Sequence, residues 1–224
     1  MRQPVLHFQL FTLLFALLLS ACTNEAYDSG DGRYSYLRAD FTEAHTIAAK
    51  TFDRATTDDG ETLRLDPYAT ADWAEKADTV YRALLYYNAL PTQGGQKKAE
   101  PVTIARVPVL YPIDDDKIEG EKKTDPVTFE SLWVSANGRY INLALLLKSG
   151  KADDPEAVQS IGITKEQSAD GSLTLRVLHD QGSVPQYYTS RIFLSIPVTD
   201  DLAGHSIRLI VNTYKGIVEK TIAL

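Results

Sequence analysis

Histidines, the side chains used most often for acid–base catalysis, are few and widely spaced in this sequence. Apart from His7 near the start, the histidines are His45, His179 and His205. His179 is the one histidine with an acidic neighbour, Asp180. Adjacent side chains on a strand point to opposite faces, so these two can pair only if the chain turns there. Two hypotheses follow for His179: a catalytic residue, or a hydrogen-bonded histidine at the end of a strand.

Other catalytic and metal chemistry leaves weaker signals. No serine lies in the Gly-x-Ser-x-Gly pattern of a hydrolase nucleophile, and no Gly-rich loop precedes a helix to hold a nucleotide phosphate. Acidic runs at 114–116, 153–154 and 200–201 could offer oxygen ligands to calcium, but they lack the spacing of a dedicated calcium loop. Solvated turns are the alternative. We predict no metal ion and no cofactor, and the sequence leaves open a carboxylate pair placed for glycoside hydrolysis.

Aromatic side chains are the remaining candidates for recognition. The sequence has 12 tyrosines and two tryptophans. Tyr187 and Tyr188 follow the turn-forming run 181–185, where they could stack on a sugar or anchor a protein partner. Because aromatics are also favoured in strands, one of the two could instead face the core. The candidate binding residues are His179, Asp180, Tyr187 and Tyr188.

The single cysteine, Cys22, ends a short apolar stretch in the manner of a bacterial lipobox. The sequence Leu-Ser-Ala-Cys at 19–22 follows the apolar run 10–19 and places small residues just before the cysteine. A run of about ten apolar residues suits a signal-peptide core, whereas a membrane-spanning helix needs roughly 20. We predict a signal peptide over residues 1–21, cleavage between Ala21 and Cys22, and lipid, including palmitate, on Cys22. An uncleaved anchor and an ordinary secretory signal are the alternatives.

Processing at this site determines much of the chemistry that remains. The mature chain has no free thiol, so we expect no disulfide, zinc–thiolate site or cysteine nucleophile. The formal net charge of the full sequence is −7, and the signal peptide removes one further positive charge, Arg2. Such an acidic chain lacks the basic stripe that nucleic-acid phosphates require, so we predict no nucleic-acid partner. Residues 22–32 are small, polar and acidic, and we expect a flexible tether.

The anchor also predicts a location and a first partner. The partner is the membrane, reached through the lipid on Cys22, because acyl chains supply the apolar area that binding requires. The predicted location is the outer membrane of the cell envelope, with exposure at the cell surface as a further expectation. An envelope protein or a glycan is the expected partner beyond the membrane.

The hydrophobic pattern that must position these residues is that of a mainly β protein in two parts. In the first, residues 33–113, alternating runs and turn signals predict a small barrel of about five strands. The Asp-Gly at 59–60, between runs at 44–52 and 61–65, is typical of a hairpin turn. Further expectations are a helical turn or two at 72–77, strands at 80–87 and 102–111, and a loop at 91–98.

A hydrophilic stretch at 114–125 is the predicted linker to the second part. There, at residues 126–224, short alternating strands predict an antiparallel β-sandwich. Asn-Gly at 137–138 indicates a hairpin between strands at 129–135 and 140–147. On the second of these strands, one face holds Ile141, Leu143, Leu145 and Leu147. Further strands are expected at 173–177, 192–196, 207–212 and 218–222.

In order and pattern the chain resembles the NigD-like lipoproteins of Bacteroidetes. The resemblance is carried by the lipobox and by residues 81–88, 107–110, 124–131, 133–145, 179–182, 184–188 and 213–220. It implies an N-terminal OB-like barrel followed by a C-terminal β-sandwich over nearly the full mature chain. The family takes its name from an operon associated with a bacteriocin, and it offers no catalytic residues to carry over to this sequence.

Together these features predict a lipid-anchored envelope protein that acts as a non-enzymatic binding module. Its ligand would be a protein, a peptide or a glycan near the cell surface. The resemblance implies an alternative, an accessory or immunity protein associated with a bacteriocin. Hydrolysis at His179 or at a carboxylate pair is a third hypothesis.

Overall fold

A computed structural model describes residues 37–152, 154, 156–169 and 171–224, of which Arg38–Leu224 form one compact unit. The predicted signal peptide, the Ala21–Cys22 cleavage and lipidation site and the tether 22–32 lie outside the described residues. Within the described part of the chain, no helix has the length and apolarity needed to cross a bilayer.

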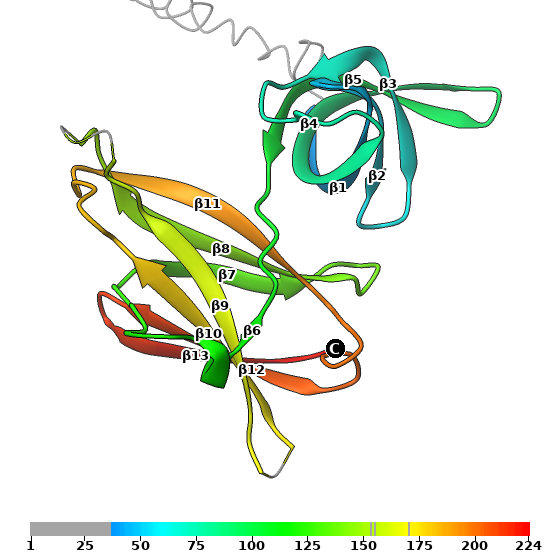
Figure 1. Cartoon of the computed structure of the whole chain (residues 1–224). Coiled ribbons are helices and arrows are strands. Elements are labelled where there is room, and N and C mark those ends of the chain that lie inside the picture. The colour runs from blue at the N-terminus through cyan, green and yellow to red at the C-terminus, as the bar shows by residue number, and fades with distance from the viewer. Residues whose placement is uncertain (1–36, 153, 155, 170) are drawn as a thin grey trace, which may run out of the picture. The chain divides into compact units, whose positions relative to one another are not determined.

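Five strands form a closed barrel at the start of the described chain, which confirms the predicted barrel (Figure 1). They are β1 (Leu37–Ala48), β2 (Thr51–Thr57), β3 (Thr62–Thr70), β4 (Thr79–Gln93) and β5 (Gln96–Arg106). Their order around the barrel is β1-β2-β3-β5-β4, and closure leaves no free sheet edge. The interior is filled by Phe52, Leu65, Leu85 and Tyr87, all fully buried.

Within the barrel, the turn predicted at 58–60 is present, whereas two neighbouring predictions are wrong. Gly60 has a φ of 82°, and the turn at this residue joins β2 to β3. The run 44–52 is not one strand, because the chain turns at Lys50 (φ 65°) between β1 and β2. The loop predicted at 91–98 is a hairpin in which β4 and β5 continue to a turn at Gly94–Gly95. The polar composition there reflects solvent exposure rather than a loop.

The helical turn predicted at 72–77 is also absent from the described structure. The Thr46 hydroxyl donates to the Lys76 carbonyl at 2.8 Å and holds the backbone in an irregular course. Trp73 packs against Phe52 and Tyr81, with ring centroids 5.2 and 5.6 Å away. These tertiary contacts outweigh the weak helical propensity of six residues.

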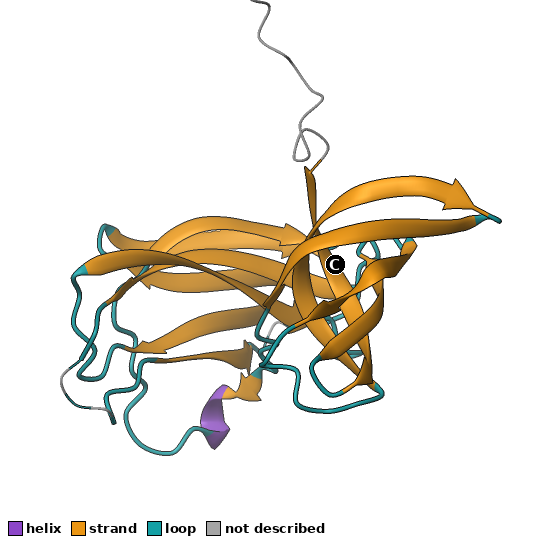
Figure 2. Ribbon diagram, turned by 90° about the horizontal axis from the view of Figure 1, so that it is seen from above, coloured by secondary structure: helices purple, strands orange, loops and turns teal. Residues whose placement is uncertain are grey.

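The remaining strands form two sheets (Figure 2). One sheet has the order β13-β12-β10-β9-β6 and the other β11-β8-β7. Their bounds are β6 (Ile113–Asp114), β7 (Thr128–Val134), β8 (Tyr140–Ser149), β9 (Ser160–Gln167), β10 (Leu173–Asp180), β11 (Tyr188–Pro197), β12 (Ser206–Thr213) and β13 (Gly216–Ala223). A single 3₁₀ turn, η1 (Asp115–Lys117), interrupts the strands of the described chain.

The two sheets enclose a core as the strand pattern predicts. Fully or almost fully buried are Ile141, Leu143, Leu145 and Leu147 of β8, facing Leu175 and Leu209 of the larger sheet, among others. The hairpin at 137–138 is present, with Gly138 at a φ of 69°. Most pairings are antiparallel, and the exceptions are β10 with β12 and β6 with β9. The fold class, a small barrel followed by a β-sandwich, is therefore confirmed.

The chain passes from barrel to sandwich through residues Val107–Asp114, which we call the crossover segment. Leu110 donates its backbone N–H to Ser195 of β11 at 2.9 Å, and Ser195 donates to Pro108 at 3.0 Å. Ile113 and Asp114 then pair with Thr164 and Lys165 of β9. The segment thus links the edges of both sheets.

The stretch 114–125, predicted to be the linker, runs along the sandwich and contains the last residue of β6 and all of η1. Its charges pair locally: Lys117 with Asp114, and Lys122 with Asp115 at 2.5 Å. Its hydrophilicity therefore reflects an exposed course over a sheet. The bounds of the two domains themselves stay a prediction.

A buried polar cluster joins the barrel to the sandwich within the compact unit. The Arg82 guanidinium of β4, 1% exposed, donates to both carboxylate oxygens of Asp58. From the sandwich, Asn142 and Ser195 accept hydrogen bonds from the same guanidinium at 3.1 Å. Its cation also lies 4.1 Å from the centre of the Tyr140 ring. Asn142 alternates with the core residues of β8 and so lies on the opposite face of the strand, yet it is fully buried because the barrel covers it.

Candidate functional site

His179 is a buried residue whose two ring nitrogens are both engaged. It is 2% exposed on β10. Its Nδ1 lies 3.0 Å from the Asp125 carbonyl and its Nε2 lies 3.0 Å from the Gln159 amide nitrogen. A carbonyl only accepts, so the hydrogen bond to Asp125 is donated by the ring through Nδ1. This geometry matches the hydrogen-bonded strand-end hypothesis.

Asp180 does not pair with His179. Its carboxylate accepts the backbone N–H of Gly182 at 2.8 Å, closing the turn that follows β10. The Asp125 carboxylate accepts the backbone N–H of Gln181 at 2.8 Å. His179 thus holds the 123–125 stretch against the sheet, and Asp180 holds the turn that follows β10. Neither nitrogen of the His179 ring is left to move a proton.

A different histidine has an acidic environment. His45 on β1 contacts Asp53 through Nδ1 at 2.6 Å and Asp78 through Nε2 at 3.0 Å. The hydrogen bonds to Asp53 and Asp78 raise the pKa of His45. His45 and Arg54 in turn hold the pKa of Asp53 below its usual value, against the effect of burial. The arrangement favours the imidazolium form and links three segments of the barrel.

The acidic runs carry lysine partners. Asp114 and Asp201 both contact Lys165, and the lysine contacts lower the pKa of each carboxylate. Asp153, half of the run 153–154, lies outside the described residues. Within the described chain, no group of three or more His, Cys, Asp or Glu side chains is arranged to hold a metal ion.

Tyr187 and Tyr188 lie together at the start of β11 and are exposed. Tyr187 is 76% exposed and Tyr188 67%, and their rings meet edge to face with centroids 6.5 Å apart. Tyr187 also packs over Gly150, where a Cβ would lie 3.0 Å from its ring and 2.9 Å from the Pro185 carbonyl oxygen. Neither tyrosine faces the core, so the alternative that one of them does so is wrong.

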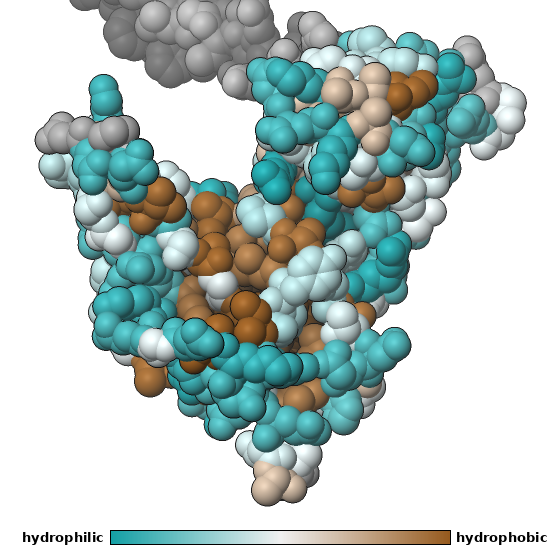
Figure 3. Space-filling model, in the orientation of Figure 1, coloured by the Kyte–Doolittle hydropathy of each residue, from teal (hydrophilic) through white to brown (hydrophobic). Residues whose placement is uncertain are grey.

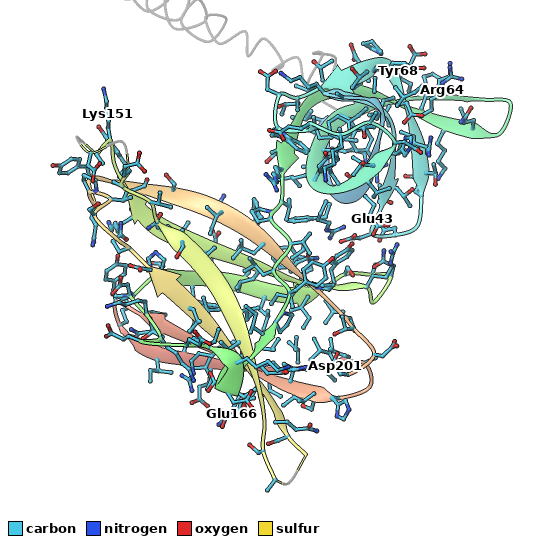
Figure 4. The ribbon with its side chains drawn as sticks, in the orientation of Figure 1. Glu43, Arg64, Tyr68, Lys151, Glu166 and Asp201 are labelled. Carbon is cyan, nitrogen blue, oxygen red and sulfur yellow. The ribbon has the colours of Figure 1, made fainter. Side chains whose placement is uncertain are left out.

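Three further exposed apolar side chains lie at the same end of the sandwich, two in loops and Ile217 at the start of β13. Val158 and Ile217 are 68% and 65% exposed, and Tyr214 is 46% exposed. Tyr214 lies 3.5 Å from Gln186 through its hydroxyl, and the Val158 carbonyl closely approaches Gly182. We call this surface the tyrosine end; it comprises Val158, Tyr187, Tyr188, Tyr214 and Ile217. Figure 4 marks its edge at Lys151, on the β8–β9 loop.

For one of these three residues the exposure could be predicted from the sequence. Tyr214 precedes a Lys-Gly turn, and a large aromatic in a tight turn has little access to a sheet core. Val158 and Ile217 carry no comparable signal, because a lone aliphatic residue beside a strand is equally common in a core. Their exposure follows from loop packing that depends on distant residues.

Solved structures with this fold are known. A NigD-like immunity protein from Bacteroides caccae matches with a TM-score of 0.63 and 22% identity, over 82% of this chain and 91% of that chain. A protein of unknown function, DUF1344, from Bacteroides vulgatus matches with a TM-score of 0.60 and 17% identity, over 84% and 90%. A candidate lipoprotein from Bacteroides fragilis matches with a TM-score of 0.52 and 11% identity, over 83% and 96%. No family model and no curated protein matches the chain.

The class that the structure defines is a two-part β protein, with a five-stranded closed barrel followed by a two-sheet sandwich. Its fold is that of the NigD-like proteins, as the resemblance in sequence predicts. At 22% identity and below, the similarity is one of fold, and the residues of the site must be argued from this chain.

Proposed function

We propose that the chain is a non-enzymatic binding module that uses the tyrosine end to contact a protein, a peptide or a glycan. The observation that carries the proposal is the exposure of Tyr187 and Tyr188, at 76% and 67%. Tyrosine rings bind through an apolar face and a polar hydroxyl, and they are enriched among residues that dominate binding energy. Exposed apolar side chains gathered at one end of a domain are typical of interaction sites.

The state of the histidines supports a binding role over hydrolysis. Both His179 nitrogens are used in structural hydrogen bonds, so a hydrolytic role for it would require the 123–125 stretch to detach. A general base must reach the proton it removes within hydrogen-bond distance. His45 has two carboxylate partners, which suit a structural ion pair.

The proposed location is the cell envelope, with the protein anchored to the outer membrane by lipid on Cys22 and exposed at the surface. The lipobox sequence supports the anchor. The similarity of fold to a candidate lipoprotein from Bacteroides fragilis agrees with it. A surface position would present the tyrosine end to extracellular or envelope partners.

Photo-crosslinking in the intact bacterium tests the proposal. Benzoylphenylalanine placed at Tyr187 is expected to give a crosslinked partner that mass spectrometry identifies. The matched control is the same probe at Tyr68 on β3, which is 46% exposed and lies on the barrel. A crosslink at both positions, or at neither, would contradict a binding role for the tyrosine end.

A bacteriocin-associated accessory or immunity role is the second candidate, because a NigD-like immunity protein shares this fold. That role predicts that deletion of the gene sensitises the bacterium to a toxin secreted by related strains, and that restoring the gene protects it. Equal survival of the deleted and restored strains would remove this candidate. The crosslinked partner from the first experiment then shows whether the tyrosine end binds the toxin.

A further inference from the structure

Along one edge of β11, most of the backbone N–H and C=O groups have no neighbouring strand among the described residues to which they could hydrogen-bond. Its register with β8 is continuous over Tyr188–Pro197, and the backbone N–H and C=O of Ser195 both face away from β8, toward the crossover segment. Backbone direction alternates along a strand, so the groups of Thr189, Arg191 and Phe193 face the same way. Among the described strands, none lies on that side of β11.

The facing edge of the larger sheet is open over the corresponding stretch. β9 has β10 on one side, and on the other the two-residue β6 covers Thr164 and Lys165. Residues Ser160–Ile163 therefore have no strand on that side within the described chain. We call the space between these residues and Thr189–Phe193 of β11 the seam.

The crossover segment shows that the edges of β9 and β11 are close to each other. It also shows that an extended chain fits between them. Leu110 bonds to β11 and Ile113 pairs with β9, and three residues span at most about 11 Å. Extended chain thus already bridges the two sheets at one end of the seam through main-chain hydrogen bonds. The seam continues from there toward Tyr188, a run of about six residues or roughly 20 Å.

The seam has an apolar floor. Ile161 of β9 and Ile192 of β11 are half-buried and pack against the sandwich core, and Leu110 of the crossover segment does the same. Figure 3 shows a hollowed apolar region on this face of the sandwich, over β9 and β11. An apolar hollow bordered by two unpaired strand edges is a template for strand addition, which proteins normally block.

We propose that the seam binds an extended polypeptide segment of a partner protein by strand addition. The segment continues the course of the crossover segment, bonds to the outward groups of β11, and directs every second, apolar side chain onto Ile161 and Ile192. This inference rests on the proposed binding function and names its ligand as peptide rather than glycan. Tyr188 begins β11, so the tyrosine end forms the outer rim of the same site.

A displayed library of random decapeptides, panned on the full mature protein, supplies the probe. The selected peptides are expected to alternate apolar and polar residues with a period of two. In hydrogen-exchange NMR, the best-binding peptide should slow exchange at the amides of Thr189, Arg191 and Phe193. Failure to select any peptide, or binding without this protection, overturns the proposal.

A matched pair of variants separates main-chain pairing from side-chain effects. Arg191→Pro and Arg191→Ala both lose the ion pair with Glu130. Only proline removes the outward N–H, and the ladder to β8 keeps its bonds because that N–H does not take part in it. Arg191→Pro is expected to weaken binding of the selected peptide about tenfold relative to Arg191→Ala.

The outcomes distinguish this inference from the binding role on which it rests. If Tyr188→Ala abolishes binding while Arg191→Pro and Arg191→Ala bind equally, the tyrosine end is a binding site and strand addition is wrong. If Tyr187 crosslinks a glycan and the library yields no peptide, the binding function stands and its ligand class changes. The N-methylated form of the selected peptide, which lacks backbone N–H donors, should bind poorly if strand addition is correct.

Discussion

The guanidinium of Arg82 donates two hydrogen bonds to the carboxylate of Asp58, of 2.6 and 2.8 Å. The Arg82 side chain is 1% exposed and that of Asp58 is 15% exposed, so the pair is shielded from water. A buried cation without its partner carries a large desolvation cost. Asp58 therefore neutralises the buried charge of Arg82. By holding the guanidinium in place, it also supports the hydrogen bonds of Arg82 to Asn142 and Ser195.

Replacing Asp58 with asparagine should lower the free energy of unfolding by about 3 kcal/mol, because it leaves the Arg82 charge uncompensated. Chemical denaturation measures the change. The control is Asp72→Asn, which removes a pair between Asp72 and Lys50 that are 97% and 56% exposed. Exposed pairs contribute about 1 kcal/mol or less. Equal effects of the two substitutions would show that the buried cluster contributes nothing special.

His179→Ala should destabilise the fold by about 2 kcal/mol, because it leaves the Asp125 carbonyl without its ring donor and opens a cavity at a residue that is 2% exposed. Thermal and denaturant unfolding report the loss. Asp180→Asn keeps an oxygen that accepts from Gly182, so its stability should stay within about 0.5 kcal/mol of wild type. A stable His179→Ala protein that has lost an activity would instead revive the catalytic hypothesis.

His45 makes stability depend on pH. Its pKa is raised in the folded state by Asp53 and Asp78, so the stabilisation is fully present below the ordinary pKa of about 6.5 and is lost as pH rises through the folded value. The pKa of Asp53 is lowered, so its contribution is lost as pH falls below the usual carboxylate range. The melting-temperature difference between wild type and His45→Gln should be larger at pH 5.5 than at pH 8.5.

The control for this pH effect is His205→Gln, since His205 is exposed. The melting-temperature difference between wild type and this variant should change little over the same pH interval. If His45→Gln and wild type lose stability in parallel from pH 5.5 to 8.5, the two carboxylates do not stabilise the imidazolium.

Gly150→Ala should disturb the tyrosine end without altering a tyrosine. Its Cβ would lie 2.9 Å from the Pro185 carbonyl oxygen and 3.0 Å from the Tyr187 ring, so the loop must shift. A loss of about 1 kcal/mol and weaker binding are expected. Gly162→Ala is the control for stability alone, because its Cβ meets nothing within 4 Å. Unchanged binding by Gly150→Ala would mean that the position of Tyr187 is not critical.

Strand pairs joined by short turns could be predicted from sequence, because their signals are local. Alternating Ile141, Leu143, Leu145 and Leu147 identify one face of β8, and Asn-Gly at 137–138 fixes its hairpin. No local signal predicts β9, because it carries Ile161, Gly162 and Ile163 in sequence and lacks a clear polar alternation. The segment 72–77 was mistaken for a helical turn because the contacts of Thr46 and Trp73 that hold it are not local.

The site was only partly predictable for the same reason. Tyr187 and Tyr188 could be singled out by their place after a turn, but their exposure depends on the packing of Pro185 and Tyr187 over Gly150. The burial of Arg82 gave no sequence signal, since an arginine between Tyr81 and Ala83 suits an exposed strand position. Its partners Asn142 and Ser195 lie 60 and 113 residues away in the chain.

The Arg82 cluster has an evolutionary consequence. A barrel that carries Arg82 needs a sandwich that offers the Asn142 amide oxygen and the Ser195 hydroxyl, which accept from the guanidinium and also bond to each other. Recombination that exchanged one half between relatives would therefore join mismatched surfaces and strand a buried charge. Substitutions at Asp58, Arg82, Asn142 and Ser195 are therefore expected to be tolerated only in compensating combinations.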